Sequence, residues 1–293
     1  MPTVTRRTFL ESSARWLGSA VMLSAARWVM PQDSDSLRLA LVSDTHISQD
    51  PANEYRGFKP YDNFQRVASD VLAMNPAAIF IDGDLARLEG LPGDYAQLKT
   101  LLQPWIEACP VCFALGNHDH RENFLAVFDT HPGEDPGIKN KHALIVETAP
   151  LRLLVLDSLL FTNEVPGLLG KTQRDWLKEY LVQGDDKPTL VFFHHTLGDG
   201  DGDLLDVERV MDILTPHRSV KAVIYGHSHV YDYNLREVIH LINLPALGYN
   251  FRDVDPVGWI EATLSAAGGV FKLHAAGGNT TRDGQTTTLQ WRA

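Results

Sequence analysis

The sequence predicts an α/β protein built from two packed, mostly mixed sheets with helices on their outer faces. Two observations predict this class. In the first part of the chain, apolar runs typical of strands alternate with amphipathic helices, whereas the later strands follow one another without helices between them. The chain also has 293 residues, of which 44% are hydrophobic, and this is enough to bury one large core.

Each predicted element rests on its own pattern. The strands are apolar, β-branched runs bounded by turn residues, and they cover residues 37–42, 77–81, 111–115, 143–147, 151–156, 189–193, 220–225, 238–241, 258–264 and 269–274. The helices repeat apolar residues every three or four positions, as Phe64, Val67 and Val71 do. They cover residues 61–74, 95–107, 172–182 and 203–214.

The start of the chain predicts a leader. Arg6 and Arg7 precede a short apolar segment that ends in small residues, and this order resembles a twin-arginine signal peptide. We expect residues 1–30 to form the signal, residues 31–37 a linker and residues 38–293 a single domain. The expected consequences are a transient contact with the twin-arginine translocase and export to the periplasm or the exterior.

A membrane anchor is the alternative interpretation of this leader. Only eleven residues separate Arg15 from Arg27, whereas a spanning helix needs about 20 apolar residues. We therefore expect no stable membrane span.

The leader carries four arginines and one glutamate, so its removal would make the formal charge of −11 more negative. Because nucleic-acid binding depends on lysines and arginines and no basic run is present, we expect no nucleic-acid duplex as a partner.

The chain has two cysteines, Cys109 and Cys112. They stand three positions apart around a predicted strand, so their side chains should point to opposite faces. We expect buried packing, and a disulfide or a redox role is the alternative in an exported protein.

Five short groups of possible metal ligands follow predicted strands. They are Asp44-Thr45-His46, Gly83-Asp84, Gly116-Asn117-His118-Asp119, His194-His195 and Gly226-His227-Ser228-His229. The carboxyl ends of strands in open α/β sheets meet at one edge, where such proteins place their chemistry. Oxygen and imidazole ligands without thiolates suit Fe, Mn or Zn. Each group alone could be an ordinary turn, but their joint order predicts a two-metal hydrolase.

The pattern suggests how the first groups are used. Asp44 and His46 alternate along an extended segment and should share one face. Asp84 ends a buried strand and could give one carboxylate oxygen to each of two cations, which two-metal hydrolases hold ~3.5 to 4 Å apart. Asp82 should point away, so we do not assign it a role.

The later groups suggest ligands and a proton donor. Asn117 is a neutral oxygen ligand, and the adjacent His118 can stay free to handle protons. Asp119 is expected to orient His118 by a hydrogen bond. His227 and His229 alternate as Asp44 and His46 do and should share a face.

The ordered pattern D-x-H, G-D, G-N-H-D/E, H and G-H-x-H resembles the calcineurin-like metallophosphoesterase superfamily, from residue 38 to about residue 250. The resemblance implies a four-layered α/β/β/α sandwich and two divalent or mixed-valence metal ions. One ion would be held by Asp44, His46, Asp84 and His229, and the other by Asp84, Asn117, His194 and His227.

The resemblance also favours one branch and one mechanism. We prefer His194 to His195 because the family uses the histidine that ends the strand. Arg87 stands where purple acid phosphatases have a tyrosine, and the histidine at position 46 also differs from that branch, so class III cyclic-nucleotide phosphodiesterases are the closer type. The expected mechanism is attack by hydroxide held at the metals, with His118, supported by Asp119, protonating the leaving oxygen.

The substrate is less well defined by the sequence. We expect hydrolysis of a phosphodiester or phosphomonoester bond in a small substrate, with a cyclic nucleotide as one candidate. The alternatives are a phosphomonoesterase for phosphoproteins or sugar phosphates and a non-catalytic metal-binding protein. Residues 55–61 are aromatic and basic and could stack on a nucleotide or form a plain surface loop, and residues 198–203 predict an acidic rim.

Overall fold

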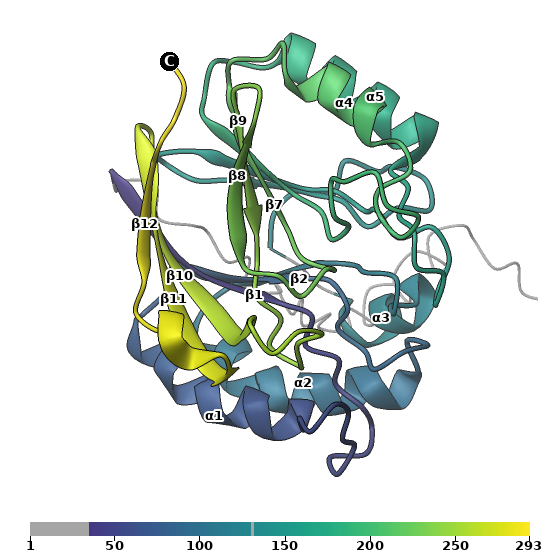
Figure 1. The fold of residues 1–293 in the computed structure, drawn as a ribbon. Helices are drawn as coiled ribbons and strands as arrows, with labels where there is room; N and C mark the ends of the chain where they lie inside the picture. Colours follow the sequence, from purple (N-terminus) through teal and green to yellow (C-terminus); the bar gives the residue numbers. More distant parts are fainter. Residues whose placement is uncertain (1–34, 130–131) are drawn as a thin grey trace, which may run out of the picture.

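The computed structural model describes residues 35–129 and 132–293. The predicted signal peptide and residues 31–34 of the predicted linker lie outside these residues. Two six-stranded sheets face each other, and helices cover the outer face of each (Figure 1). The fold is therefore the expected α/β/β/α sandwich of two mixed sheets, and the prediction of the fold class is confirmed.

The first sheet has the strand order β12-β11-β10-β1-β2-β3. The bounds are β1 (Ser36–Ser43), β2 (Ala78–Asp82), β3 (Val111–Ala114), β10 (Pro256–Ser265), β11 (Gly268–Gly278) and β12 (Thr286–Gln290). Strands β1, β2 and β3 are parallel, while β10 pairs antiparallel with β1 and continues the sheet through β11 and β12. Helices α1 (Pro60–Ala73), α2 (Pro92–Ala108) and α3 (Arg121–Val127) connect the parallel strands or follow them.

The second sheet has the strand order β4-β5-β6-β7-β9-β8. The bounds are β4 (Leu144–Glu147), β5 (Arg152–Val155), β6 (Thr189–Phe192), β7 (Val220–Tyr225), β8 (Asp232–Arg236) and β9 (Ile239–Asn243). Strands β5, β6, β7 and β9 run parallel, and the two edge strands are antiparallel to their neighbours. Helices α4 (Gly170–Gln183) and α5 (Val207–Leu214) cover its outer face, and a short 3-10 helix spans Thr280–Arg282.

Three buried clusters hold the four layers together. One fills the space between the sheets, where the rings of Phe80 and Phe192 stack with centroids 4.7 Å apart. The other two lie under the helices on either side, around Trp105 and around Leu177. Large buried apolar areas of this kind dominate the stability of a domain. The result is a rigid platform whose strand ends can position polar side chains.

The two cysteines are free and buried, which confirms the expected packing. Cys112 lies in the cluster between the sheets and Cys109 under the helices. Burial raises the pKa of both thiols.

Within the residues that the structure describes, no helix has both the length and the apolar character needed to cross a bilayer.

One predicted boundary was wrong, and two strands and one α-helix were not predicted. The helix expected from residue 203 begins at Val207, because the Asp203 carbonyl, which would accept from the Val207 nitrogen in such a helix, accepts from the Gly167 nitrogen at 3.1 Å. Strands β8 and β12 were not predicted, since their residues are mostly exposed and polar. The seven-residue helix α3 was missed because it buries one side chain, Phe124.

Candidate metal centre

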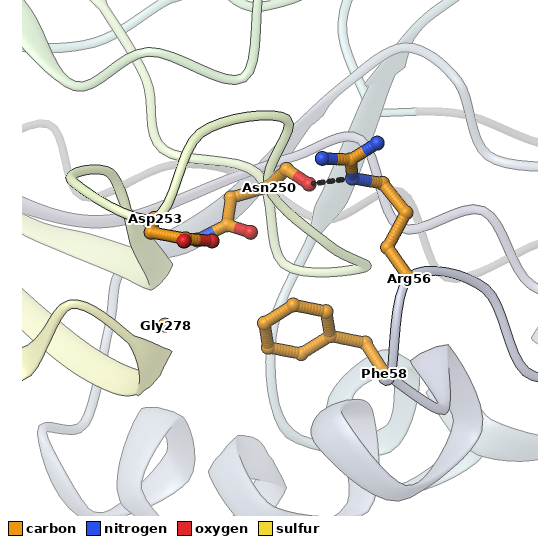
Figure 2. Close-up of a pocket in the computed structure, with 5 residues that line it drawn as sticks. All are labelled: Arg56, Phe58, Asn250, Asp253 and Gly278. Carbon is orange, nitrogen blue, oxygen red and sulfur yellow. Dashed lines mark hydrogen bonds between the residues drawn. The ribbon is translucent and has the colours of Figure 1, made fainter.

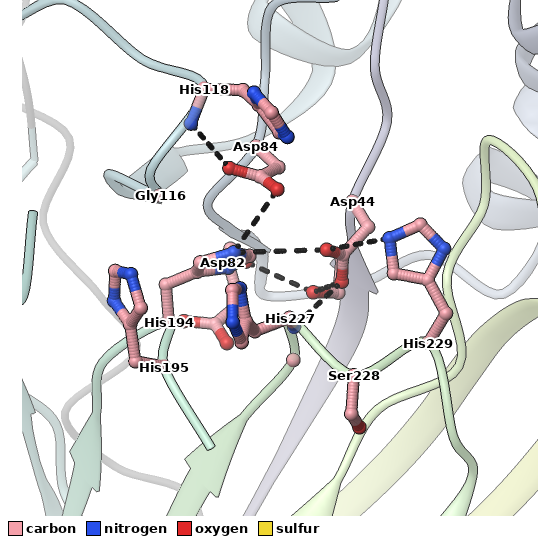
Figure 3. A network of polar contacts seen from close by, with 12 residues as sticks. Asp44, Asp82, Asp84, Gly116, His118, His194, His195, His227, Ser228 and His229 are labelled. Carbon is pink, nitrogen blue, oxygen red and sulfur yellow. Dashed lines mark hydrogen bonds and ion pairs between the residues drawn. The ribbon is translucent and has the colours of Figure 1, made fainter. Parts of the chain in front are cut away.

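The five predicted groups meet at the carboxyl ends of the parallel strands. Asp44 directly follows β1, Asp84 lies two residues beyond β2, and Asn117 three residues beyond β3. From the second sheet, His194 and His227 each lie two residues beyond β6 and β7. Figure 3 shows the side chains of Asp44, Asp84, His194 and His227 converging between the two sheets. Two sheets therefore contribute to one site, at the carboxyl ends of their parallel strands.

The donor atoms form two compact groups. We call Asp44, His46 and His229 the first donor group, and Asp84, His194 and His227 the second donor group; within each, the nitrogen and oxygen atoms lie within 4.8 Å of one another. One donor atom each of His46, Asp84 and His118 also lies within 4.8 Å of the other two. The structure thus brings together every histidine and aspartate that the sequence predicted as a ligand.

Each aspartate uses one oxygen to hold a loop and turns the other toward histidines. Asp44 Oδ2 accepts hydrogen bonds from Ser43 Oγ at 2.5 Å and the His227 backbone nitrogen at 3.2 Å, while its Oδ1 lies 3.2 Å from His229 Nε2. Asp84 Oδ1 accepts from the His118 backbone nitrogen at 2.8 Å. Each carboxylate therefore has one oxygen left for another partner.

Asp84 is the carboxylate that connects the two donor groups. Its Oδ2 lies 3.3 Å from His194 Nε2, in the second donor group, and 3.7 Å from His46 Nε2, in the first donor group. This position between the two groups is the one that a shared ligand would need.

Backbone hydrogen bonds set the orientation of the imidazoles. Each of five histidines places one ring nitrogen against a backbone carbonyl: His194 Nδ1 on Asp82 at 2.7 Å, His229 Nδ1 on Tyr249 at 2.6 Å, His227 Nε2 on Gly202 at 2.9 Å, His118 Nδ1 on Leu88 at 2.9 Å and His46 Nδ1 on Arg87 at a long 3.4 Å. A carbonyl can only accept, so the bonded nitrogen carries the proton. When the ring is neutral, the other nitrogen keeps its lone pair, as a metal ligand must.

The backbone reaches this arrangement by tight left-handed turns. Asp44, His46, Asp84, His227 and His229 have φ values of 51°, 46°, 45°, 68° and 56°. The expected extended alternation of Asp44 with His46 and of His227 with His229 is therefore wrong, although each pair does share the site. Left-handed conformations are costly for residues other than glycine and concentrate at functional sites.

Two glycines allow the loops to approach closely. A Cβ atom at Gly116 would stand 2.2 Å from Asp84 Oδ1, and one at Gly226 would stand 2.0 Å from Ser43 Oγ. Both distances are far below van der Waals contact, so a larger residue would displace the carboxylates.

Several donor atoms are buried without a hydrogen-bond partner among the described residues. They are Asp44 Oδ1, Asn117 Oδ1 and His194 Nε2. A buried polar atom left unpaired costs about 1 to 3 kcal/mol. Their chemistry, carboxylate, amide and imidazole without thiolate, fits a divalent cation bound by oxygen and nitrogen. The residues present are therefore suited to hold metal.

The electrostatics favour a cation in the same place. Burial alone would raise the pKa of Asp44, but the neighbouring His229 and His194 lower it to about 2. Burial alone would lower the pKa of His194, but Asp84 and Asp44 raise it to about 10. For His46, burial dominates and lowers the pKa to about 3. Ionised carboxylates thus attract positive charge to this site, and a metal cation would take the place of the proton on His194.

Asp119 does not play the expected role. It accepts hydrogen bonds from the backbone nitrogens of Gly116, Leu85 and Ala86 at 2.9, 3.2 and 3.2 Å, and from Tyr95 Oη at 3.0 Å, but none from His118. The prediction that it orients His118 was wrong, because the Leu88 carbonyl holds that ring. Asp119 joins the loop after β2 to the loop after β3.

His195 and Asp82 lie next to the donor groups without belonging to them. His195 is buried, and its Nδ1 lies 2.7 Å from Ser158 Oγ. Burial raises the pKa of the Asp82 carboxyl to about 8, and neither of its oxygens has a hydrogen-bond partner among the described residues. The preference for His194 over His195 and the exclusion of Asp82 agree with this geometry.

Sequence reasoning missed two supports of the site. Tyr249 accepts from His229 through its carbonyl and stacks on His46 with ring centroids 4.6 Å apart. Ser43 could have been noticed in the sequence only because it directly precedes Asp44.

In the predicted acidic rim, Asp199 and Asp201 are exposed, but Asp203 turns back to accept from the Gly200 nitrogen at 2.9 Å.

Comparison with known proteins agrees with this geometry. Residues 37–231 match the calcineurin-like phosphoesterase family, so the chain belongs to that family and is a metal-dependent phosphoric ester hydrolase. The family implies divalent metal ions, and the two donor groups could hold them.

Three individual proteins show how similar this chain is to known phosphoesterases. The chain is 27% identical to a probable cyclic nucleotide phosphodiesterase of Synechococcus, over 80% of this chain and 91% of that protein. It is also 27% identical to the 3',5'-cyclic adenosine monophosphate phosphodiesterase CpdA of Haemophilus influenzae, over 83% and 91% of the two chains. A dimetal phosphatase from Danio rerio shares the fold, with a TM-score of 0.67 and 16% identity over 87% of this chain and 99% of that one.

Proposed function

We propose that the protein is a binuclear-metal phosphodiesterase that hydrolyses a small phosphate diester, with a 3',5'-cyclic nucleotide as its substrate. The observation that carries this proposal is the position of Asp84, whose free oxygen lies within 3.7 Å of histidines from both donor groups. The similarity to proteins named as cyclic nucleotide phosphodiesterases supports the diester.

The ligand sets follow from the donor groups. Asp44, His46 and His229 would hold one ion, and His194 and His227 the other, with Asp84 shared. Asn117 would complete the second set through its unpaired Oδ1. When bound, two divalent ions, Fe, Mn or Zn, would supply Lewis-acid activation of the phosphoryl group and of water.

We assign His118 the handling of the leaving-group proton. The Leu88 carbonyl fixes the proton on Nδ1, and the half-buried ring therefore presents Nε2 toward the side of His46 and Asp84. In the imidazolium form the ring carries a second proton on Nε2, and transfer of that proton to a departing ribose oxygen would make this oxygen a better leaving group and leave the ring neutral, with its proton on Nδ1. Asp119 would act at a distance, by fixing the loop that carries Asn117 and His118.

The proposal is tested by metal-dependent turnover on a panel of three substrates: 3',5'-cyclic AMP, bis(p-nitrophenyl) phosphate and p-nitrophenyl phosphate. We expect chelation to abolish activity, added Mn, Fe or Zn to restore it, and the two diesters to be hydrolysed faster than the monoester. A preference for the monoester would contradict a diesterase, and the absence of metal-dependent turnover on all three would contradict the function itself.

We also propose that residues 1–30 direct export through the twin-arginine translocase, which would place the enzyme outside the cytoplasm. The paired Arg6 and Arg7 ahead of an apolar segment support this proposal.

A further inference from the structure

Aromatic side chains border the first donor group. We call Tyr55, Tyr249 and Phe251 the aromatic surface. The Tyr249 ring stacks on His46 with centroids 4.6 Å apart, and Phe251 stacks on His229 at 4.4 Å. Tyr249 is buried, whereas Tyr55 and Phe251 are 40% and 45% exposed. The surface is therefore continuous with two of the proposed ligands on one side and open to solvent on the other.

A tight turn holds Tyr55 in place. The backbone of Tyr55 and Phe58 exchanges two hydrogen bonds of 2.9 Å, and the residues between them, Arg56 and Gly57, have φ values of 55° and 82°. Two successive left-handed residues between paired neighbours are typical of a type I′ turn. The Tyr55 and Tyr249 rings also meet in a T-shaped arrangement, with centroids 4.8 Å apart.

The turn is tied to the segment that carries Phe251. Arg56 donates from Nε to the Asn250 carbonyl at 2.9 Å and from Nη2 to the Phe251 carbonyl at 2.7 Å. Figure 2 shows the first of these bonds, at the edge of a cavity of about 290 Å³ that Phe58 and Asn250 also line. The aromatic surface is thus fixed before any ligand arrives.

Two guanidinium groups lie against the exposed rings. The Arg87 guanidinium carbon is 4.8 Å from the centre of the Tyr55 ring, and that of Arg56 is 5.8 Å from the centre of the Phe251 ring. Arg87 is further held by Asn53 Oδ1 at 3.0 Å. Because each guanidinium lies over its ring, a ligand would stack on the part of the Tyr55 or Phe251 ring that the arginine leaves uncovered, with fixed N–H donors beside it.

We infer that the aromatic surface is the binding site for the nucleobase of the substrate, with Tyr55 and Phe251 as the stacking residues. A nucleobase is a planar aromatic group with hydrogen-bond acceptors along its edge, which matches both features of the surface. Rigid aromatic groups add contact area at a low entropic cost. This inference rests on the proposed function, because it places the base beside a phosphate held at the two donor groups.

Phe161 offers the one competing position among the exposed aromatic side chains of the described residues. It is 67% exposed and lies on the loop whose Asn163 nitrogen donates to the Asn117 carbonyl at 2.6 Å. This loop therefore approaches the second donor group through Asn117. No guanidinium is placed over the Phe161 ring among the cation–π contacts of the described residues, so the electrostatic match is poorer there.

The test compares two ligands that share a phosphate and differ in the base. Isothermal titration of the metal-loaded, full-length protein would measure the dissociation constants of AMP and ribose 5-phosphate. The wild-type protein should bind AMP more tightly. Base stacking on an aromatic side chain corresponds to a roughly 5- to 150-fold effect, so Tyr55→Ala and Phe251→Ala should each reduce the affinity ratio by an amount in that range.

Three variants act as controls. Tyr55→Phe keeps the ring and should keep the wild-type ratio. Leu235→Ala removes an exposed apolar side chain from the remote edge strand β8 and should also keep it. Phe161→Ala tests the competing position. Because Phe251 contacts His229, metal content is measured for Phe251→Ala. Tyr55 meets Tyr249 rather than a donor-group residue and gives the cleaner result.

The outcomes separate this inference from the proposed function. Equal affinities of the wild-type protein for AMP and ribose 5-phosphate, or a ratio that falls only in Phe161→Ala, would overturn the nucleobase site even if the diesters are hydrolysed. A ratio that depends on Tyr55 in a protein without metal-dependent turnover would instead support the site and overturn the proposed function.

Discussion

Replacing His118 by alanine should slow catalysis without releasing metal. The Leu88 carbonyl fixes one ring nitrogen, and Asn117 and Asp84 already supply oxygen donors nearby. A positioned general acid contributes a factor on the order of 10² to 10⁴ in rate, or about 2.7 to 5.5 kcal/mol of transition-state stabilisation. The variant also loses one partly exposed hydrogen bond, at a cost of about 1 kcal/mol in the free energy of unfolding, so it should remain folded.

The assay compares kcat for two diesters with different leaving groups. The loss should be largest for 3',5'-cyclic AMP, whose ribose oxygen needs a proton, and much smaller for bis(p-nitrophenyl) phosphate, whose phenolate leaves without one. The neighbouring His120→Ala is the matched control, since His120 caps α3 by accepting from the Asn123 nitrogen and belongs to no donor group. Equal losses on both diesters would refute the proton-donor role, and loss of one metal equivalent would make His118 a ligand.

Three further changes follow from the same contacts. Gly226→Ala should weaken metal binding, measured by elemental analysis, because the added Cβ would stand 2.0 Å from Ser43 Oγ. Unchanged metal content would show that the loop can move aside. Tyr95→Phe should lower the free energy of unfolding by about 1 to 3 kcal/mol, since it removes the hydroxyl bonded to Asp119, and chemical denaturation that gives no difference would argue against this link. Changing Arg6 and Arg7 to lysine should leave folded precursor in the cytoplasm, as fractionation would show, whereas unchanged export would point to another route.

The sequence was sufficient for the position of the site because its residues occupy strand ends. Once β1, β2 and β3 are recognised as parallel neighbours, and β6 and β7 likewise, the residues that follow them must gather at one end of their own sheet. Asp44 and Asp84 could therefore be placed together, and the family pattern joined His194 to them. The order of apolar runs similarly predicted the two sheets, because burial of strands on both faces leaves a continuous apolar signal.

The connections within the site were beyond sequence reasoning. The partner of Asp119 could not be foreseen, because the backbone nitrogens that bind it come from two loops that meet through the fold. The left-handed φ of Asp44 and His46 was hidden because neither residue is glycine, the usual marker of that conformation. The carbonyl of Tyr249 carries no side-chain signal at all, although it orients His229.

The central claim is that one carboxylate, Asp84, joins two metal ions, and metal stoichiometry tests it most directly. Elemental analysis of the purified wild-type protein should give about two equivalents of metal, and Asp84→Asn should lose metal from both positions together with activity. Asp82→Asn is the matched control, because Asp82 lies two residues away, belongs to no donor group among the described residues and has a raised pKa; it should retain both equivalents. About two equivalents and wild-type turnover in Asp84→Asn would contradict the claim.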